Sequence, residues 1–220
     1  KIASKVMLGF PGAFTGEKVS VVGNPVRDSI IALHGKARDF THTPVRISII
    51  GGSLGARALN ELVPLALKKF TDDSILVTHQ CGKGNSDKVK ALYESASFKV
   101  EATDFIDNMD ALYANTDLII CRAGALTVAE TSTAGIPAIF VPLPTAVDDH
   151  QTKNASVLAK AGAALVCKQS SLSADSLYDL VKSLVDDREK LAFMSAKAYE
   201  CAITDATERA VKIIESVVKD

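Results

Sequence analysis

The sequence predicts an α/β protein, with a doubly wound parallel sheet at its centre. Short apolar runs alternate with amphipathic stretches along most of the 220 residues, and the turns between them are brief. Runs that are apolar on both faces are typical of parallel strands covered by helices on both sides. Alternation of such strands with helices favours a doubly wound sheet.

The elements of this sheet follow from the apolar pattern in chain order. Brief, mostly apolar runs rich in β-branched residues predict strands at residues 46–50, 75–79, 99–103, 118–121, 138–141 and 164–167. Apolar residues at helical spacing predict helices between them at residues 54–70, 86–95, 109–115, 126–134 and 148–161.

The two ends of the chain differ from the middle. Residues 1–16 contain no strand pattern, and a seventh strand of the same kind as the six above is expected at residues 19–22. Asn24 suits an N-cap and Pro25 the first position of a helix at residues 25–33. A polar loop at residues 35–44 precedes the main domain, and helical patterns at residues 174–201 and 206–218 follow it.

Composition narrows the classes of function. Lys and Arg number 25 against 26 Asp and Glu, so no overall positive field attracts nucleic acid. The four cysteines are scattered without metal-ligand spacing and fit a reducing cytoplasm. No apolar run reaches the roughly 18 residues of a membrane-spanning helix. No metal is expected at Asp148, Asp149 and His150, because adjacent residues on a helix turn point in different directions and no second cluster supports them. No cofactor is expected either.

The turn at residues 51–56 is the first candidate site, because ligands of open parallel sheets bind beyond the carboxyl ends of the strands. Its sequence, Gly-Gly-Ser-Leu-Gly-Ala, lets a phosphate approach main-chain N–H groups at the start of a helix. It is neither the dinucleotide fingerprint nor a P-loop. A tight turn with only a structural role is the alternative.

Two later turns carry further candidates. Small residues at 123–125 leave N–H groups open at another helix start. Glu130 lies three residues after Thr127, which fits either a capping box or a carboxylate that accepts hydrogen bonds from ribose hydroxyls. In the turn at residues 142–151, His150 and Gln151 offer hydrogen-bonding groups suited to sugar hydroxyls.

Taken together, these motifs resemble the MurG family of glycosyltransferases over effectively the whole chain. The matching segments are GNPVR at 23–27, GGSLGA at 51–56, HQCGKG at 79–84, DFIDNM at 104–109, CRAGALTVAE at 121–130, GIPAIFVPLPTAVDDHQTKNA at 135–155 and DATERA at 205–210. The resemblance implies a GT-B architecture in which this chain is the C-terminal, donor-binding half.

The resemblance also implies the reaction and its partners. N-acetylglucosamine would pass from UDP-N-acetylglucosamine, with inversion, to the 4-hydroxyl of the muramoyl sugar on undecaprenyl pyrophosphate. Such an enzyme works in the cytoplasm, peripherally on the inner face of the bacterial membrane. The lipid-linked acceptor, the membrane and the likely catalytic base would belong to an N-terminal domain. We therefore expect this chain to bind the donor weakly and to lack transferase activity alone.

Carried onto matching positions, the resemblance assigns the donor-binding residues. Arg27 and Ser53 would hold the diphosphate, with Gly52, Leu54 and Gly55 as further candidates in the same turn. Ile106 would contact uracil, Glu130 the ribose hydroxyls, and Gln151 the sugar, with His150 as its neighbouring candidate. The rest of the diphosphate and nucleoside would lie along Ala125, Leu126, Thr127, Val128 and Ala129.

The implied domain layout is a tail of the N-terminal domain at residues 1–22 and a linker with a helix at 23–44. The UDP-sugar-binding domain would span residues 45–203, and a helix at 204–220 would return to the N-terminal domain. Two other functions stay open: a UDP-sugar-binding subunit of a split glycosyltransferase, and a UDP-N-acetylglucosamine 2-epimerase-like enzyme.

Overall fold

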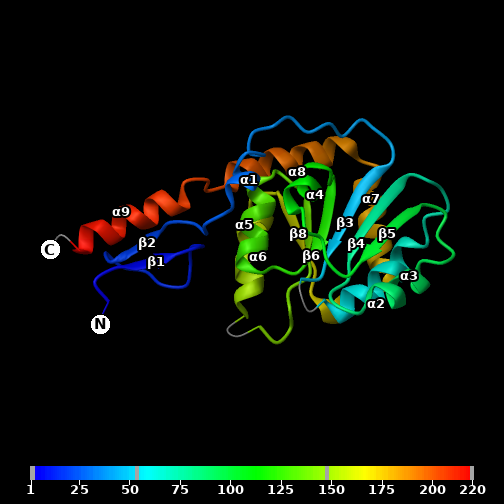
Figure 1. Ribbon diagram of the computed structural model, residues 1–220, viewed down its shortest axis with the longest axis horizontal. Helices are drawn as coiled ribbons and strands as arrows, with labels where there is room; N and C mark the ends of the chain where they lie inside the picture. The colour runs from blue at the N-terminus through cyan, green and yellow to red at the C-terminus, as the bar shows by residue number, and fades with distance from the viewer. Residues whose placement is uncertain (1–2, 53–54, 147–148, 219–220) are drawn as a thin grey trace.

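The computed structural model describes residues 3–52, 55–146 and 149–218 and is built around a six-stranded sheet (Figure 1). All of its neighbouring strands are parallel. Their spatial order is β5 (Lys99–Thr103), β4 (Ile75–Gln80), β3 (Val45–Ile50), β6 (Leu118–Cys121), β7 (Ala138–Phe140) and β8 (Ala164–Val166). This is the strand order of a doubly wound Rossmann sheet, so the predicted fold class is confirmed.

Helices cover both faces of the sheet, because each strand is followed by a crossover connection (Figure 1). One group consists of α2 (Arg57–Leu67), which packs against both α3 (Ser86–Leu92) and α7 (Ala174–Val185). The other consists of α5 (Ala125–Thr133), α6 (His150–Lys160) and α8 (Arg188–Cys201). Short helices α1 (Asp28–Ile31) and α4 (Met109–Ala114) contact each other, and a 3-10 turn, η2 (Gln169–Ser171), follows β8.

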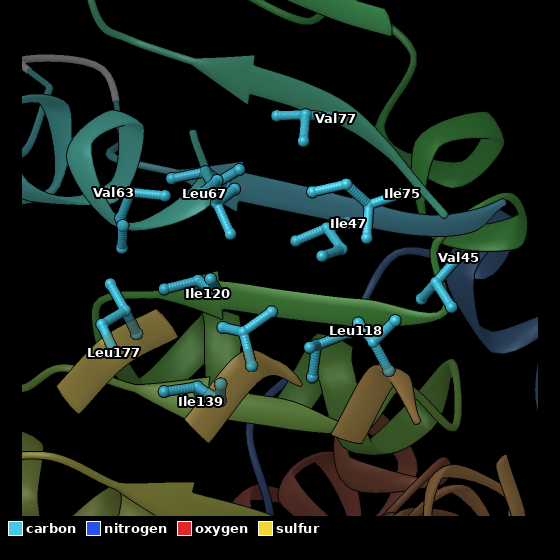
Figure 2. Packing of buried hydrophobic residues seen from close by; sticks show 14 of the residues in the cluster. Val45, Ile47, Val63, Leu67, Ile75, Val77, Leu118, Ile120, Ile139 and Leu177 are labelled. Carbon is cyan, nitrogen blue, oxygen red and sulfur yellow. The ribbon is translucent and has the colours of Figure 1, made fainter. Parts of the chain in front are cut away.

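The main core lies between the sheet and the first of these helix groups. Figure 2 shows Val63 and Leu67 of α2 above the side chains of the central strands. The strand residues Ile47, Leu118 and Ile120 are at most 1% exposed. Burial of apolar surface contributes about 25 cal/mol per Å² to stability, so a shift of these strands would be costly. Their fixed position also fixes where the turns at their ends begin.

A second, two-stranded sheet lies outside the main one. In it, β1 (Val6–Leu8) pairs in parallel with β2 (Val19–Val21). The expectation of no strand within residues 1–16 was therefore wrong, because three residues are too few to give a recognisable alternation. The last helix, α9 (Ala206–Val218), extends away from the main sheet toward this end of the molecule (Figure 1).

Several predicted helices have different bounds in the structure, and two of the differences have a clear local cause. The helix expected at residues 25–33 begins only at Asp28, because Arg27 is extended with φ −63° and ψ 143°. The single pattern at residues 174–201 is two helices, α7 and α8. Their boundary lies at Asp187, whose side chain accepts a hydrogen bond from the main-chain N–H of Lys190 and so caps α8.

A buried polar network joins α2 and α3 to the end of β4. His79 is fully buried, and its ring nitrogens lie 3.1 Å from the Tyr93 hydroxyl and 3.1 Å from Asn60 Oδ1. Asn60 Nδ2 donates to the carbonyl of Cys81 at 2.8 Å. This orientation of the amide makes His79 Nε2 the donor to Asn60, and in the neutral ring Nδ1 then accepts from the Tyr93 hydroxyl.

Burial makes the stability of this network depend on pH. Desolvation lowers the pKa of His79 to about 4, below the roughly 6.5 of an unfolded histidine. As pH falls from 6.5 to about 4, His79 therefore binds a proton in the unfolded chain but not in the folded chain, which favours unfolding.

We expect this histidine to remove on the order of 3 kcal/mol of unfolding free energy across that window. Urea denaturation between pH 7 and pH 4.5 measures the loss. His79→Gln lacks the titrating ring, so its stability should fall less steeply. Identical slopes for the two proteins would contradict the assignment.

Two leucines of α2 test the position of the core. Leu59 is fully buried, whereas Leu65 is 48% exposed on the same helix. Leu59→Ala should lower the unfolding free energy by about 3 kcal/mol, because it removes core contacts and leaves a cavity. Leu65→Ala is the matched control and should change it by less than about 0.5 kcal/mol. Equal losses in chemical denaturation would show that α2 faces the sheet differently.

Candidate functional site

The candidate site lies at the carboxyl ends of β3 and β6, the two central strands between which the direction of winding reverses. Ile50 of β3 is in register with Cys121 of β6. The turns that begin at Gly51 and Arg122 therefore leave the sheet side by side. Pairing at the centre of the sheet thus brings together two of the turns selected from the sequence.

The first turn requires glycine at two positions for steric reasons. A Cβ on Gly55 would lie 2.2 Å from the carbonyl oxygen of Cys81, and the φ of Gly55 is +76°. A Cβ on Gly51 would lie 2.6 Å from the main-chain nitrogen of Ala56. Gly52 is exposed and also has a positive φ, of +79°. The predicted site residues Ser53 and Leu54 lie outside the described residues.

Gln80, the last residue of β4, holds this turn in place. Its Oε1 accepts from the main-chain N–H of Gly52 at 3.0 Å, and its Nε2 donates to the Gly52 carbonyl at 3.0 Å. The same Nε2 donates to the carbonyl of Asp104 at 2.9 Å. The sequence analysis missed Gln80, although its place at the end of a central strand was the available signal.

The second turn leads directly into α5, whose N-cap is Gly124. No side chain caps this end, so the first main-chain N–H groups of α5, from Ala125 to Thr127, lie at an uncapped helix start. Leu126 is 57% exposed there, whereas the side chains of Val128 and Ala129 are buried in the core. The capping-box alternative for Thr127 and Glu130 is wrong, because both residues lie inside the helix.

Glu130 is instead joined to residues far away in the sequence. Its Oε1 lies 3.3 Å from Arg27 Nη2, and its Oε2 accepts a 2.9 Å hydrogen bond from the hydroxyl of Tyr113. The Glu130 side chain is 16% exposed and that of Arg27 is 55% exposed. Two residues predicted to bind the donor, Arg27 and Glu130, are thus in contact with each other.

A pocket of about 670 Å³ opens beside the glycine-rich turn. Gly51 and Gly55 form one side of it, and Gln151 with the loop after β7 forms another. The side-chain oxygen of Gln151 accepts a 2.9 Å hydrogen bond from the main-chain N–H of Leu143, which fixes this loop against the start of α6. The pocket therefore joins the first and third turns selected from the sequence.

Arg122 supplies positive charge to this pocket. Its Nη1 donates to the carbonyls of Val141 and Pro142 at 2.9 and 3.2 Å, and its Nη2 donates to Gln169 Oε1 at 2.8 Å. Burial lowers the pKa of Arg122, yet a guanidinium stays charged. The sequence analysis did not select Arg122 or Gln169. Arg122 could have been found, since it is the first residue after β6.

The remaining predicted residues lie apart from this pocket. Ile106 is half-buried in the loop between β5 and α4. His150 and Ala125 line a smaller pocket of about 240 Å³ together with Asn24, Lys153 and the loop after β1. His150 and Gln151 are neighbours in the sequence but line different pockets.

Two further properties concern the described residues alone. No group of three or more His, Cys, Asp or Glu residues among them is placed to hold a metal ion. None of their helices is long and apolar enough to cross a bilayer. The prediction of a reaction without a metal or cofactor stays a prediction.

Known proteins similar to this chain agree with the predicted family. A curated transferase from Tolumonas auensis is 48% identical over 222 residues, covering 99% of this chain and 62% of that protein. One from Aeromonas hydrophila is also 48% identical, covering 95% of this chain and 58% of that protein. Both are named UDP-N-acetylglucosamine–N-acetylmuramyl-(pentapeptide) pyrophosphoryl-undecaprenol N-acetylglucosamine transferase.

One solved structure supports the same family, and a more distant one shares the fold. Acinetobacter baumannii MurG is 41% identical, with a TM-score of 0.86 that covers 98% of this chain and 61% of that one. Staphylococcus aureus MnaA, solved with UDP, has a TM-score of 0.61 at 17% identity, covers 92% of this chain and 55% of that one, and shares the fold alone. The chain spans about 60% of the length of its curated relatives.

The family model described as the glycosyltransferase family 28 C-terminal domain matches residues 46–217. This match runs from the second residue of β3 nearly to the end of α9 and includes both central turns. The chain therefore belongs to glycosyltransferase family 28, of which it carries the C-terminal domain.

Proposed function

We propose that this chain is the donor-binding half of an inverting N-acetylglucosaminyltransferase. The donor is UDP-N-acetylglucosamine, and the acceptor is the muramoyl-pentapeptide sugar carried on undecaprenyl pyrophosphate. The observation that carries the proposal is the pairing of the two turns at Gly51 and Arg122, side by side at the centre of the sheet. Such a position is where nucleotides bind in doubly wound folds.

The diphosphate would lie between these turns. Main-chain N–H groups at the starts of α2 and α5 carry partial positive charge, which favours an anion. Arg122, directly after β6, adds a full positive charge at this edge of the sheet, and Arg27 adds a second one beside Glu130 of α5. We also assign Ser53 to the diphosphate, from its place in the turn.

The nucleoside and sugar would be held by side chains around this centre. Ile106 supplies apolar contact for uracil, and Glu130 accepts hydrogen bonds from the ribose hydroxyls. Gln151 lines the pocket beside the glycine-rich turn and would bind the sugar. His150 lines the neighbouring pocket and is the second candidate for the sugar.

This arrangement suits departure of a nucleoside diphosphate. Negative charge grows on the leaving phosphate in the transition state, and fixed N–H groups with guanidinium groups stabilise it. Inversion also needs a base to accept the proton of the attacking hydroxyl. We propose that the base, the acceptor site and the peripheral contact with the inner face of the membrane belong to the part of the enzyme that this chain does not span.

Two other functions predict different results. A UDP-sugar-binding subunit of a split enzyme would transfer sugar when a separate acceptor-binding chain is added. An epimerase would convert UDP-N-acetylglucosamine without any acceptor. The likeness to MnaA concerns the fold alone, so it does not favour the epimerase.

Calorimetric titration with UDP-N-acetylglucosamine tests the proposal directly. We expect weak but saturable binding and no transfer to the lipid-linked acceptor by the chain alone. Glu130→Gln should weaken binding about tenfold, because it removes a charged acceptor for two hydroxyls. Its melting temperature should change little, since the amide keeps the size of the side chain. If the unmodified chain did not bind the donor, the proposed donor site would be refuted. If the chain alone transferred the sugar, the proposal that the catalytic base lies elsewhere would be refuted.

Gly55→Ala tests the role of the glycine-rich turn. The added methyl would collide with the Cys81 carbonyl, so the turn must shift and donor affinity should fall at least about tenfold. Gly84→Ala is the matched control, because Gly84 also has a positive φ, of +75°, but no atom within 4 Å of an added Cβ. Equal losses of affinity in the two variants would mean that backbone strain, rather than the shape of the turn, is responsible.

A further inference from the structure

A buried tyrosine lies directly behind the carboxylate of Glu130. Tyr113, near the end of α4, is 1% exposed, and its hydroxyl donates a 2.9 Å hydrogen bond to Glu130 Oε2. Arg27 contacts the other oxygen, Oε1, at 3.3 Å. Each carboxylate oxygen of Glu130 thus has one partner from a different part of the chain.

Tyr113 and Arg27 differ in how strongly they restrain the carboxylate of Glu130. The Arg27 side chain is 55% exposed, and a long, solvated ion pair contributes little to stability. Tyr113 is buried in the same hydrophobic cluster as Val26 and Ile30, so close packing confines its ring. The tyrosine, and not the arginine, therefore fixes where the carboxylate lies.

The hydrogen-bonding capacity of Glu130 fits a vicinal diol. An ionised carboxylate has about four acceptor positions, of which Tyr113 and Arg27 occupy two. Two positions remain, the number of hydrogen bonds that the two hydroxyls of a ribose can donate. The side chain is 16% exposed, so part of the carboxylate is accessible to a ligand.

The hydroxyl of Tyr113 stays protonated and so remains a hydrogen-bond donor to Glu130. Burial, reinforced by the neighbouring Glu130 charge, raises the pKa of Tyr113 well above its usual value. It stays protonated at any pH at which the protein would work, and it keeps Glu130 Oε2 as an acceptor.

We infer that Tyr113 is a positioning residue for ribose recognition, which orients Glu130 so that its carboxylate meets the two hydroxyls of the donor's ribose. This inference rests on the proposed binding of a UDP-sugar. Tyr113 itself does not touch the ligand. Its effect should therefore depend on whether the ligand carries the diol.

Two ligands separate this role from a purely structural one. UDP carries the diol, whereas 2′,3′-dideoxy-UDP has the same base and diphosphate without it. The ratio of their dissociation constants, measured by calorimetry on the 220-residue chain, is its diol preference. Tyr113→Phe should lower this preference about fivefold by weakening UDP binding, with nearly unchanged affinity for the dideoxy ligand.

Tyr93→Phe is the matched control. Tyr93 is another buried tyrosine, but its hydroxyl contacts His79 rather than Glu130. Losing it should alter both ligands equally and leave the diol preference unchanged. If Tyr113→Phe also weakened both ligands equally, the positioning role would be overturned.

A second variant covers the case in which Tyr113→Phe does not fold. Glu130→Asp keeps the charge but draws the carboxylate back by one methylene from the Tyr113 hydroxyl. We expect it to lose the diol preference as well, and full retention would overturn the inference. Failure of the unmodified chain to bind either ligand would instead refute the proposed function on which the inference rests.

Discussion

The parallel pairing of β3 with β6 is the constraint on which the rest of the site depends. Each of these strands is buried on both faces, so their relative register cannot slip without exposing apolar side chains. That register places two helix starts next to each other. An anion between them meets N–H groups from both sides, although the two segments are about seventy residues apart in the sequence. Burial of the apolar side chains of β3 and β6 thus holds the N–H groups of the two helix starts in place.

Core and site are also joined through the carbonyl of Cys81. On one side this carbonyl accepts a hydrogen bond from Asn60, which belongs to the buried network of His79 and Tyr93. On its other side it touches Gly55, where no Cβ fits. The glycine-rich turn therefore rests on an internal polar network as well as on Gln80. Such fully paired polar groups specify one arrangement of the backbone, because any other leaves a buried donor or acceptor without a partner.

Local pattern was enough to predict the six-stranded sheet, its winding and the turns at its carboxyl edge. Strands such as Ile47 to Ile50 are mostly apolar, and this composition indicates burial on both faces. Local pattern failed where three residues decide an element, as in β1, and where one cap divides a helix, as at Asp187. For Glu130 the pattern left two alternatives. Its partners Tyr113 and Arg27 lie 17 and 103 positions away, so only the folded chain could reveal them. Arg122 and Gln80 were missed although each lies at or just after the end of a predicted strand, which was a signal available in the sequence.

The glycine-rich turn offers main-chain atoms to its proposed ligand, and this has an evolutionary consequence. Substitution can change a side chain, but it cannot delete a peptide N–H unless the new residue is proline. The main-chain donors proposed for the phosphates are therefore insulated from substitutions that keep the shape of the turn, which excludes changes at Gly51 and Gly55. The groups proposed to contact the base and sugar, Ile106, Gln151 and His150, are side chains in or beside loops that single substitutions can alter. A substitution at one of these side chains would change a proposed contact to the base or sugar and leave the main-chain donors proposed for the diphosphate in place.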